Sequence, residues 1–204
     1  APLPTPEDTR MPTALQAQES AWLLMESADA PMHVGTLLVF ALPEGAGPAY
    51  LDDLRRQLRG ATVVAEPWQL RPERRNGRRR HWQVADDFDI DRHFHHAALP
   101  APGGERELGI AVERLHSRPL DRAHPPWECH LLSGLYGNRF ALYFKVHPAL
   151  TDATTVVHLL ADTLATAAQP APRAPWSTAL PGWRRAAGES PLAALRGAGG
   201  LANI

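Results

Sequence analysis

The sequence has 204 residues with 21 basic and 22 acidic side chains, which gives a formal net charge of −1. This balance excludes a general electrostatic attraction to nucleic acid, and no apolar run approaches the ~20 residues that a membrane-spanning helix needs. The single cysteine, Cys129, excludes an intrachain disulfide and fits a reducing compartment, so we expect a soluble cytoplasmic protein.

The N-terminal part of the chain predicts a leader, a helix and a strand. Residues 1–12 are rich in proline and polar residues, which favours disorder. Residues 13–27 predict a short helix whose apolar positions are Leu15, Trp22, Leu23 and Met25. A strand is expected over residues 34–42. His33 directly precedes this strand, and we interpret it as a packed structural histidine rather than a catalytic one.

An arginine cluster follows the second predicted helix. That helix covers residues 50–58 and ends at Gly60, and Val63, Val64 and Trp68 are then expected to form an edge element. The cluster contains the turn dipeptide Asn76-Gly77 and consists of Arg71, Arg74, Arg75, Arg78, Arg79 and Arg80. We favour a solvated hairpin, because short charge runs usually face water. The alternative is contact with a phosphate of coenzyme A, with a phosphopantetheine arm or with an anionic membrane surface.

The next loop is dense in aspartate and histidine. Residues 81–84 predict a strand, and the loop covers residues 86–96. Histidine and aspartate are common ligands for zinc and iron, so a metal site is one interpretation. The spacing of His93, His95 and His96 fits no recognised metal motif. We therefore predict loop packing and no metal.

The centre of the chain predicts a helix and a β-hairpin. Residues 104–118 carry an apolar stripe at helical spacing. Residues 127–134 and 140–147 each alternate with period two, and the short turn between them predicts that the two strands pair. In the second strand Tyr143, Lys145 and His147 share one face.

The second strand runs into the polar segment HPALTDA at residues 147–153. Pro148 has no backbone N–H, so sheet pairing is expected to stop there. Thr151 or Asp152 can cap a following helix, whose apolar positions are Val156, Val157, Leu159, Leu160 and Leu164. A histidine at a strand end beside an acid at a helix start is typical of a catalytic site.

This segment resembles HHxxxDG, the active-site motif of the wax ester synthase/diacylglycerol acyltransferase family. The wider superfamily includes chloramphenicol acetyltransferase, carnitine acyltransferases and peptide-synthetase condensation domains. Other segments resemble the family in the same order: PMHVG at 31–35, the aspartate-rich stretch at 82–96, ALPAPG at 98–103 and LDRAHPPWE at 120–128. The resemblance covers residues 15–164.

The resemblance implies an acyl-CoA-dependent O-acyltransferase in which the second histidine of the motif is the general base. Pro148 occupies that position here and Ala153 replaces the glycine, so only His147 and Asp152 match. A positioned base contributes roughly 10²–10⁴-fold in rate, and proline has no titratable group. In related acyltransferases the motif aspartate pairs with an arginine, which makes Arg122 a candidate partner of Asp152; an exposed arginine is the alternative.

Two functions remain open. We favour a catalytically impaired relative that acts as a binding or assembly partner. The alternative is an active acyltransferase in which His147 or a residue of a partner chain is the base. Deliberate inactivation of an active enzyme is less favoured, because it would ordinarily change the base alone and not also the glycine.

The candidate substrate contacts are Trp127, Tyr143 and Lys145. No resident cofactor is expected; the resemblance implies a coenzyme A thioester or a phosphopantetheine-linked acyl group as substrate. Acyl-CoA and an acyl carrier protein are therefore candidate partners, and any contact with a membrane or lipid droplet would be peripheral.

The element order predicts an α/β fold, a chloramphenicol acetyltransferase-like half domain in which helices flank a mixed sheet. We place this half domain at residues 13–168 and interpret residues 169–204 as a linker toward a missing C-terminal half. Half of such a fold leaves an apolar face open, and such faces mark interaction sites. We therefore expect a second half, a partner chain or self-association.

Overall fold

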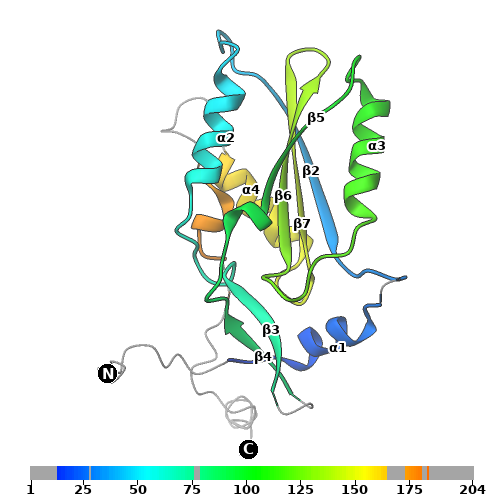
Figure 1. Cartoon of the computed structure of the whole chain (residues 1–204), viewed down its shortest axis with the longest axis vertical. Helices are drawn as coiled ribbons and strands as arrows, with labels where there is room; N and C mark the ends of the chain where they lie inside the picture. The colour runs from blue at the N-terminus through cyan, green and yellow to red at the C-terminus, as the bar shows by residue number, and fades with distance from the viewer. Residues whose placement is uncertain (1–12, 28, 76–78, 165–172, 181–182, 184–204) are drawn as a thin grey trace, which may run out of the picture.

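The computed structural model describes residues 13–27, 29–75, 79–164, 173–180 and 183 (Figure 1). Its helices are α1 (Ala17–Met25), α2 (Tyr50–Gly60), α3 (Glu105–His116) and α4 (Ala153–Leu164), with 3-10 turns η1 (Ile90–Arg92) and η2 (Pro175–Ser177). Its strands are β1 (Thr13–Ala14), β2 (Val34–Ala41), β3 (Leu70–Arg75), β4 (Arg79–Val84), β5 (Phe94–Ala98), β6 (Trp127–Leu135) and β7 (Arg139–Val146). Within the described ranges, no helix is both long and apolar enough to cross a lipid bilayer.

The central sheet has four strands in the order β2-β7-β6-β5. Strand β7 pairs antiparallel with both β2 and β6, whereas β5 runs parallel to β6. The β6–β7 turn contains Gly137 and Asn138, whose φ angles of 78° and 55° lie in the left-handed region that suits these two residue types. The predicted hairpin is confirmed, with Trp127 opposite Val146, and so is the mixed sheet.

The two faces of this sheet pack against different helices. One face carries Phe140, Leu142 and Phe144, which join leucines of α2 and α4 in the larger core. The other face carries Ala141 and Tyr143, which pack against α3. Alternate residues of β7 point to opposite faces of the sheet, and the residues on both faces are buried. The strand therefore lies at the centre of the molecule.

A smaller sheet lies beyond one end of the central sheet (Figure 1). It has three strands in the order β1-β4-β3. The indole Nε1 of Trp82 in β4 donates to Oε2 of Glu19 in α1 at 3.1 Å. This hydrogen bond and the β1–β4 pairing attach α1 to the smaller sheet.

Three expectations about secondary structure are wrong in detail. Strand β5 occupies part of the predicted aspartate- and histidine-rich loop, because it pairs parallel with a distant strand and therefore needs no adjacent turn signal. Residues 63–68 form no strand; Trp68 is instead fully buried against Trp127, and Val63 is 83% exposed. Met25 and Val157, predicted to be inward, are exposed.

Part of the segment interpreted as a linker packs into the core. Trp176 has no exposed surface, stacks on Trp127 with ring centroids 5.3 Å apart, and donates its Nε1–H to the backbone oxygen of Ala61 at 2.8 Å. Ala174 and Leu180 are buried beside it. The folded unit therefore extends through residues 173–180, while the predicted leader at residues 1–12 lies outside the described residues.

We predict that Trp176→Ala destabilises the fold by about 3–5 kcal/mol, because it removes a fully buried indole and leaves a cavity. Urea denaturation followed by tryptophan fluorescence and circular dichroism measures the change. Val63→Ala, at an 83% exposed position, is the matched control and should change stability by less than about 0.5 kcal/mol. Equal denaturation midpoints for the two variants would contradict the packing of this segment.

Candidate functional site

Both ring nitrogens of the motif histidine lie close to other groups of the protein. His147 directly follows β7 and has no exposed surface. Its Nδ1 accepts the backbone N–H of Ala149 at 3.1 Å, and its Nε2 lies 3.6 Å from Oε2 of Glu26. Because Nδ1 accepts a hydrogen bond, the ring proton belongs on Nε2, facing the carboxylate.

Glu26 is the residue that sequence analysis missed at this position. It caps the C-terminal end of α1, and its side chain is 4% exposed. Its Oε2 lies 3.3 Å from Nη1 of Arg122, and its Oε1 accepts the backbone N–H of Met32 at 3.4 Å. The carboxylate thus sits between a guanidinium and an imidazole. No local sequence pattern predicts this, because the three side chains come from segments far apart in the chain.

Asp152 has a different partner from the one expected. Its Oδ1 accepts the backbone N–H of Thr155 at 2.9 Å and its Oδ2 accepts the Thr155 hydroxyl at 2.7 Å. These hydrogen bonds stabilise the charged form and lower the pKa of Asp152. The predicted role as helix cap is confirmed, whereas Arg122 pairs with Glu26 and not with Asp152.

Lys145 is buried within a set of polar partners. It is the only lysine of the chain, its side chain has no exposed surface, and Nζ donates to the backbone oxygens of Leu115 at 3.0 Å and Arg118 at 2.8 Å. Its third partner is Oε2 of Glu128 in β6, at 3.1 Å. Burial opposes ionisation of Glu128, but the hydrogen bond from His130 at 3.0 Å and the Lys145 charge outweigh it and lower the pKa to about 2.

The other residues singled out by sequence also make internal contacts. The Tyr143 hydroxyl lies 2.6 Å from Nδ1 of His116, and burial, together with the Glu128 charge, raises its pKa to about 12. The Trp127 indole donates to the backbone oxygen of Trp68 at 2.7 Å. His33 is buried, with Nε2 at 2.7 Å from the backbone oxygen of His116, as expected for a packed histidine. A substrate contact by Trp127, Tyr143 or Lys145 stays a prediction.

The aspartate- and histidine-rich stretch has its side chains separated by packing. His93 stacks against both Phe88 and Trp127, which also contact each other, and its Nδ1 lies 2.9 Å from the Trp127 carbonyl oxygen; burial lowers its pKa to about 4. His96 lies 2.9 Å from the Ser133 hydroxyl. Within the part of the chain that the structure describes, no three His, Cys, Asp or Glu side chains are grouped closely enough to hold a metal ion.

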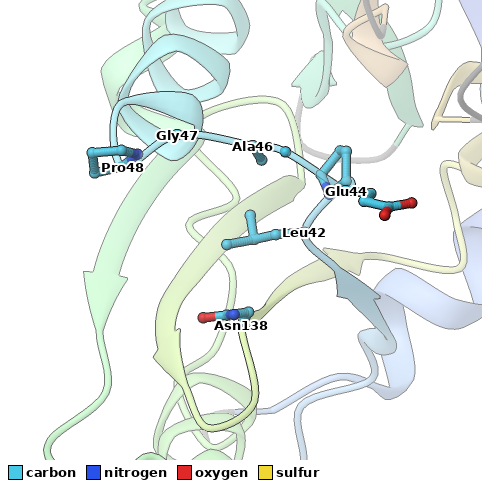
Figure 2. Close-up of a pocket in the computed structure, with 8 residues that line it drawn as sticks. Leu42, Glu44, Ala46, Gly47, Pro48 and Asn138 are labelled. Carbon is cyan, nitrogen blue, oxygen red and sulfur yellow. The ribbon is translucent and has the colours of Figure 1, made fainter.

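The pocket drawn in Figure 2 lies away from these groups. It is lined by the turn between β2 and α2, residues 42–48, and by Asn138 of the β6–β7 turn. Strand β7 begins at this turn and ends next to His147, so its full length separates the pocket from the motif. Glu44 is the one ionisable residue among those that line the pocket. The pocket is therefore a poor candidate for a catalytic site.

The fold and the motif together define the class of protein. A mixed sheet with a histidine following its central strand and an aspartate capping the next helix is a chloramphenicol acetyltransferase-like half domain. The first condensation domain of a calcium-dependent antibiotic synthetase shares the fold: the TM-score is 0.55 at 18% identity, over 73% of this chain and 36% of that one. The wax ester synthase/diacylglycerol acyltransferase catalytic domain matches residues 15–202, and the chain belongs to this family.

Individual relatives agree with this assignment. The solved wax ester synthase/diacylglycerol acyltransferase of Marinobacter aquaeolei has a TM-score of 0.77 and 37% identity, over 80% of this chain and 40% of its own. The O-acyltransferase WSD of Acinetobacter baylyi is 38% identical over 143 residues, 70% of this chain and 30% of its own. A Mycobacterium tuberculosis protein assigned as a diacylglycerol O-acyltransferase is 47% identical over 155 residues, 74% of this chain and 31% of its own. The chain thus spans about a third of the length of these curated relatives.

We predict that His147 carries its proton on Nε2 in solution, because the Ala149 amide occupies Nδ1. Two-bond ¹H–¹⁵N correlation spectra of the histidine-labelled chain near pH 8 measure the tautomer, and His147→Ala assigns the signal. Glu26→Gln should leave the tautomer unchanged, because the amide alone is sufficient to fix it. A proton on Nδ1 would contradict the contact.

We predict that the ionised Glu128 stabilises the fold above pH 4.5 and that this contribution disappears as the pH falls toward 2, because its folded pKa of about 2 lies below its ordinary value of 4.5. At pH 7 Glu128→Gln should lower the free energy of unfolding by roughly 2–4 kcal/mol. Urea denaturation of both forms between pH 7 and pH 2.5 measures the difference. A difference that stays constant over that range would refute the assignment.

Proposed function

We propose that this chain is a catalytically impaired acyltransferase-family half domain, which acts as a binding or assembly partner and does not itself deprotonate an acceptor hydroxyl. Two features together carry the proposal. Pro148 occupies the motif position of the base, and both ring nitrogens of the neighbouring His147 contact groups of the protein itself. Proline supplies no base at the position where the family motif has one. His147 would have to replace it, and its surroundings oppose that role.

A general base has to come within about 2.6–3.2 Å of the proton that it removes, with a free lone pair aimed at it. In His147 the Nδ1 lone pair accepts the Ala149 amide, and the Nε2 proton faces Glu26. The ring is also without solvent exposure. A hydroxyl could reach it only after the turn at residues 147–150 had opened.

The neighbouring ionisable groups support the same conclusion. Nζ of Lys145 donates to two backbone carbonyls and lies 3.1 Å from Oε2 of Glu128, so its N–H donors are all used within the protein. The raised pKa of Tyr143 disfavours a phenolate at neutral pH. Asp152 is ionised, but its two oxygens bond to Thr155 at the start of α4.

The proposed ligand is an acyl group carried as a coenzyme A thioester or on a phosphopantetheine arm, bound with a partner surface. The partner would be the remaining part of the family's usual length, supplied by further chain, by another protein or by a second copy. The support for this partner is a difference in length. The relatives named as O-acyltransferases are about three times as long as the segment that matches this chain. Such a partner could also contribute a base, which would make the assembly active although this half is not.

The test is restoration of chemistry in a chimera. The matching segment of the Marinobacter enzyme is replaced by this chain, and acyl transfer from a long-chain acyl-CoA to a fatty alcohol or diacylglycerol is measured. We predict that the chimera with the unaltered chain is about 10²–10⁴-fold slower than the Marinobacter enzyme, and that Pro148→His with Ala153→Gly recovers a large part of this loss.

Ala153→Gly alone is the matched control, because it changes the same turn without adding a base and should recover nothing. An unaltered chimera that is as active as the parent enzyme, and that loses activity in His147→Ala, would overturn the proposal and make His147 the base. The same assay on the isolated chain reports activity that needs no partner, which would also overturn it.

A further inference from the structure

Strand β2 is an edge of the central sheet. In the part of the chain that the structure describes, β2 pairs with β7 alone, in an unbroken register from Val34 opposite Val146 to Ala41 opposite Arg139. Residues 34–42 read VGTLLVFAL and contain no charged residue and no proline. Edge strands are usually protected from further pairing by charged side chains, by proline or by β-bulges. The eight residues of β2 carry none of these protections.

The backbone groups that point away from β7 belong to the odd-numbered residues of β2. At the end of the ladder the backbone N–H of Leu42 donates to the backbone oxygen of Asn138 at 2.8 Å. Backbone groups of alternate residues point to the same side of a strand, so the even-numbered residues of β2 bond to β7. The residues whose N–H and C=O groups point to the free edge are therefore Gly35, Leu37, Val39 and Ala41.

The side chains of the same residues lie on the α3 side of the sheet and are exposed. Leu37 lies opposite Tyr143, which packs against α3. Figure 1 shows α3 on one side of the central sheet and α2 on the other. Helix α3 leaves the edge strand uncovered, because Leu37 is 38% exposed and Val39 is 42% exposed. The free edge thus presents backbone donors and acceptors together with apolar side chains, and an added strand can use both.

The free edge of β2 is complementary to itself. Two antiparallel copies related by a two-fold axis at Leu38 place Leu37 of one copy opposite Val39 of the other, and Gly35 opposite Ala41. All the outward-pointing residues of both strands then lie in hydrogen-bonded pairs, whereas an axis at Leu37 or Val39 leaves one of them opposite a residue outside β2. No charged side chains face each other. Because a two-fold contact uses both free edges, the assembly closes as a dimer and does not continue into a fibre.

We infer that the free edge of β2 is a dimerisation surface, on which a second copy of this chain adds its own β2 so that the two four-stranded sheets form one continuous sheet. The inference goes beyond the proposed function and does not depend on it. The contact consists of one strand pair and the side chains of Leu37 and Val39, which is small compared with the interface of a permanent complex. We therefore expect a dissociation constant on the order of micromolar.

The test is sedimentation velocity of the full 204-residue chain over a range of concentrations from about 1 µM to about 500 µM, where we predict a monomer–dimer equilibrium. Val39→Pro should weaken dimerisation at least about tenfold, because it removes an outward-pointing N–H from each copy. An edge strand tolerates proline where the N–H faces outward, so the fold is kept, and circular dichroism verifies this. Val39→Thr is the matched control: it keeps the N–H and the β-branched shape, and should change the dissociation constant by less than about threefold.

Engineered cysteines test the register of the two strands. A two-fold axis at Leu38 brings the two Cα atoms of that position to about 4.5 Å, so Leu38→Cys should form an intermolecular disulfide under mild oxidation. Thr36→Cys is the matched control on the same face of the strand. Its two Cα atoms would be about 14 Å apart, too far for a disulfide. The natural Cys129 is buried and should not react. Non-reducing electrophoresis measures the cross-linked fraction.

Three outcomes would overturn the inference. The first is a chain that stays monomeric over the whole concentration range; if it then binds the separately supplied C-terminal part of the Marinobacter enzyme through β2, the edge belongs to the missing half. The second is a dimer that Val39→Pro does not weaken, which would place the contact elsewhere on the molecule. The third is cross-linking in Thr36→Cys but not in Leu38→Cys, which is incompatible with the two-fold axis.

Discussion

The buried ammonium group of Lys145 is the interaction on which the end of the central sheet depends. Its three N–H donors meet two carbonyls at the end of α3 and the carboxylate of Glu128. A buried charge that loses its partner destabilises a protein by several kcal/mol, whereas one with satisfied donors and an opposite charge is tolerated. This requirement holds α3 at one position along the sheet. It also places His116 against Tyr143 and His33, so a row of polar groups on this face follows from one buried lysine.

The strand beside β7, β2, is constrained by the Tyr143 side chain. Position 35 of β2 has to be glycine, because a Cβ there would overlap the Tyr143 ring. The tyrosine therefore lies across β2, reaches His116, and fills the space between the sheet and the end of α3. Substrate would have to displace well-satisfied internal contacts to reach this face. The polar groups here act first as structure, and their internal contacts are sufficient to account for their presence without a catalytic role.

The sequence predicted those parts of the fold in which neighbouring residues carry the information. The alternation in β6 and β7, the short turn between them and the helix cap at Asp152 are local features, and all three are confirmed. The rest depended on distant contacts. Strand β5 pairs parallel with β6, Trp176 enters the core from a proline- and alanine-rich segment, and Glu26 meets His147 across more than a hundred residues. The family resemblance supplied the position in the motif that Pro148 occupies, but not the contacts of the two ring nitrogens of His147.

The turn after β7 explains how the fold accommodates proline at the motif position of residue 148. The backbone N–H groups of Ala149, Leu150 and Thr151 all bond back to His147, to its Nδ1 or to its carbonyl oxygen. Position 148 is thus the residue of this turn whose backbone N–H the turn does not use, so a proline, which lacks that N–H and fixes φ, fits there without loss of a hydrogen bond. Replacing His147 would remove the Nδ1 acceptor of the buried Ala149 amide, although the carbonyl oxygen that accepts from Leu150 and Thr151 would remain, and replacing Asp152 would uncap α4. Fold stability alone is therefore sufficient to retain these two residues of the motif, and their presence is not evidence that the chemistry has been kept.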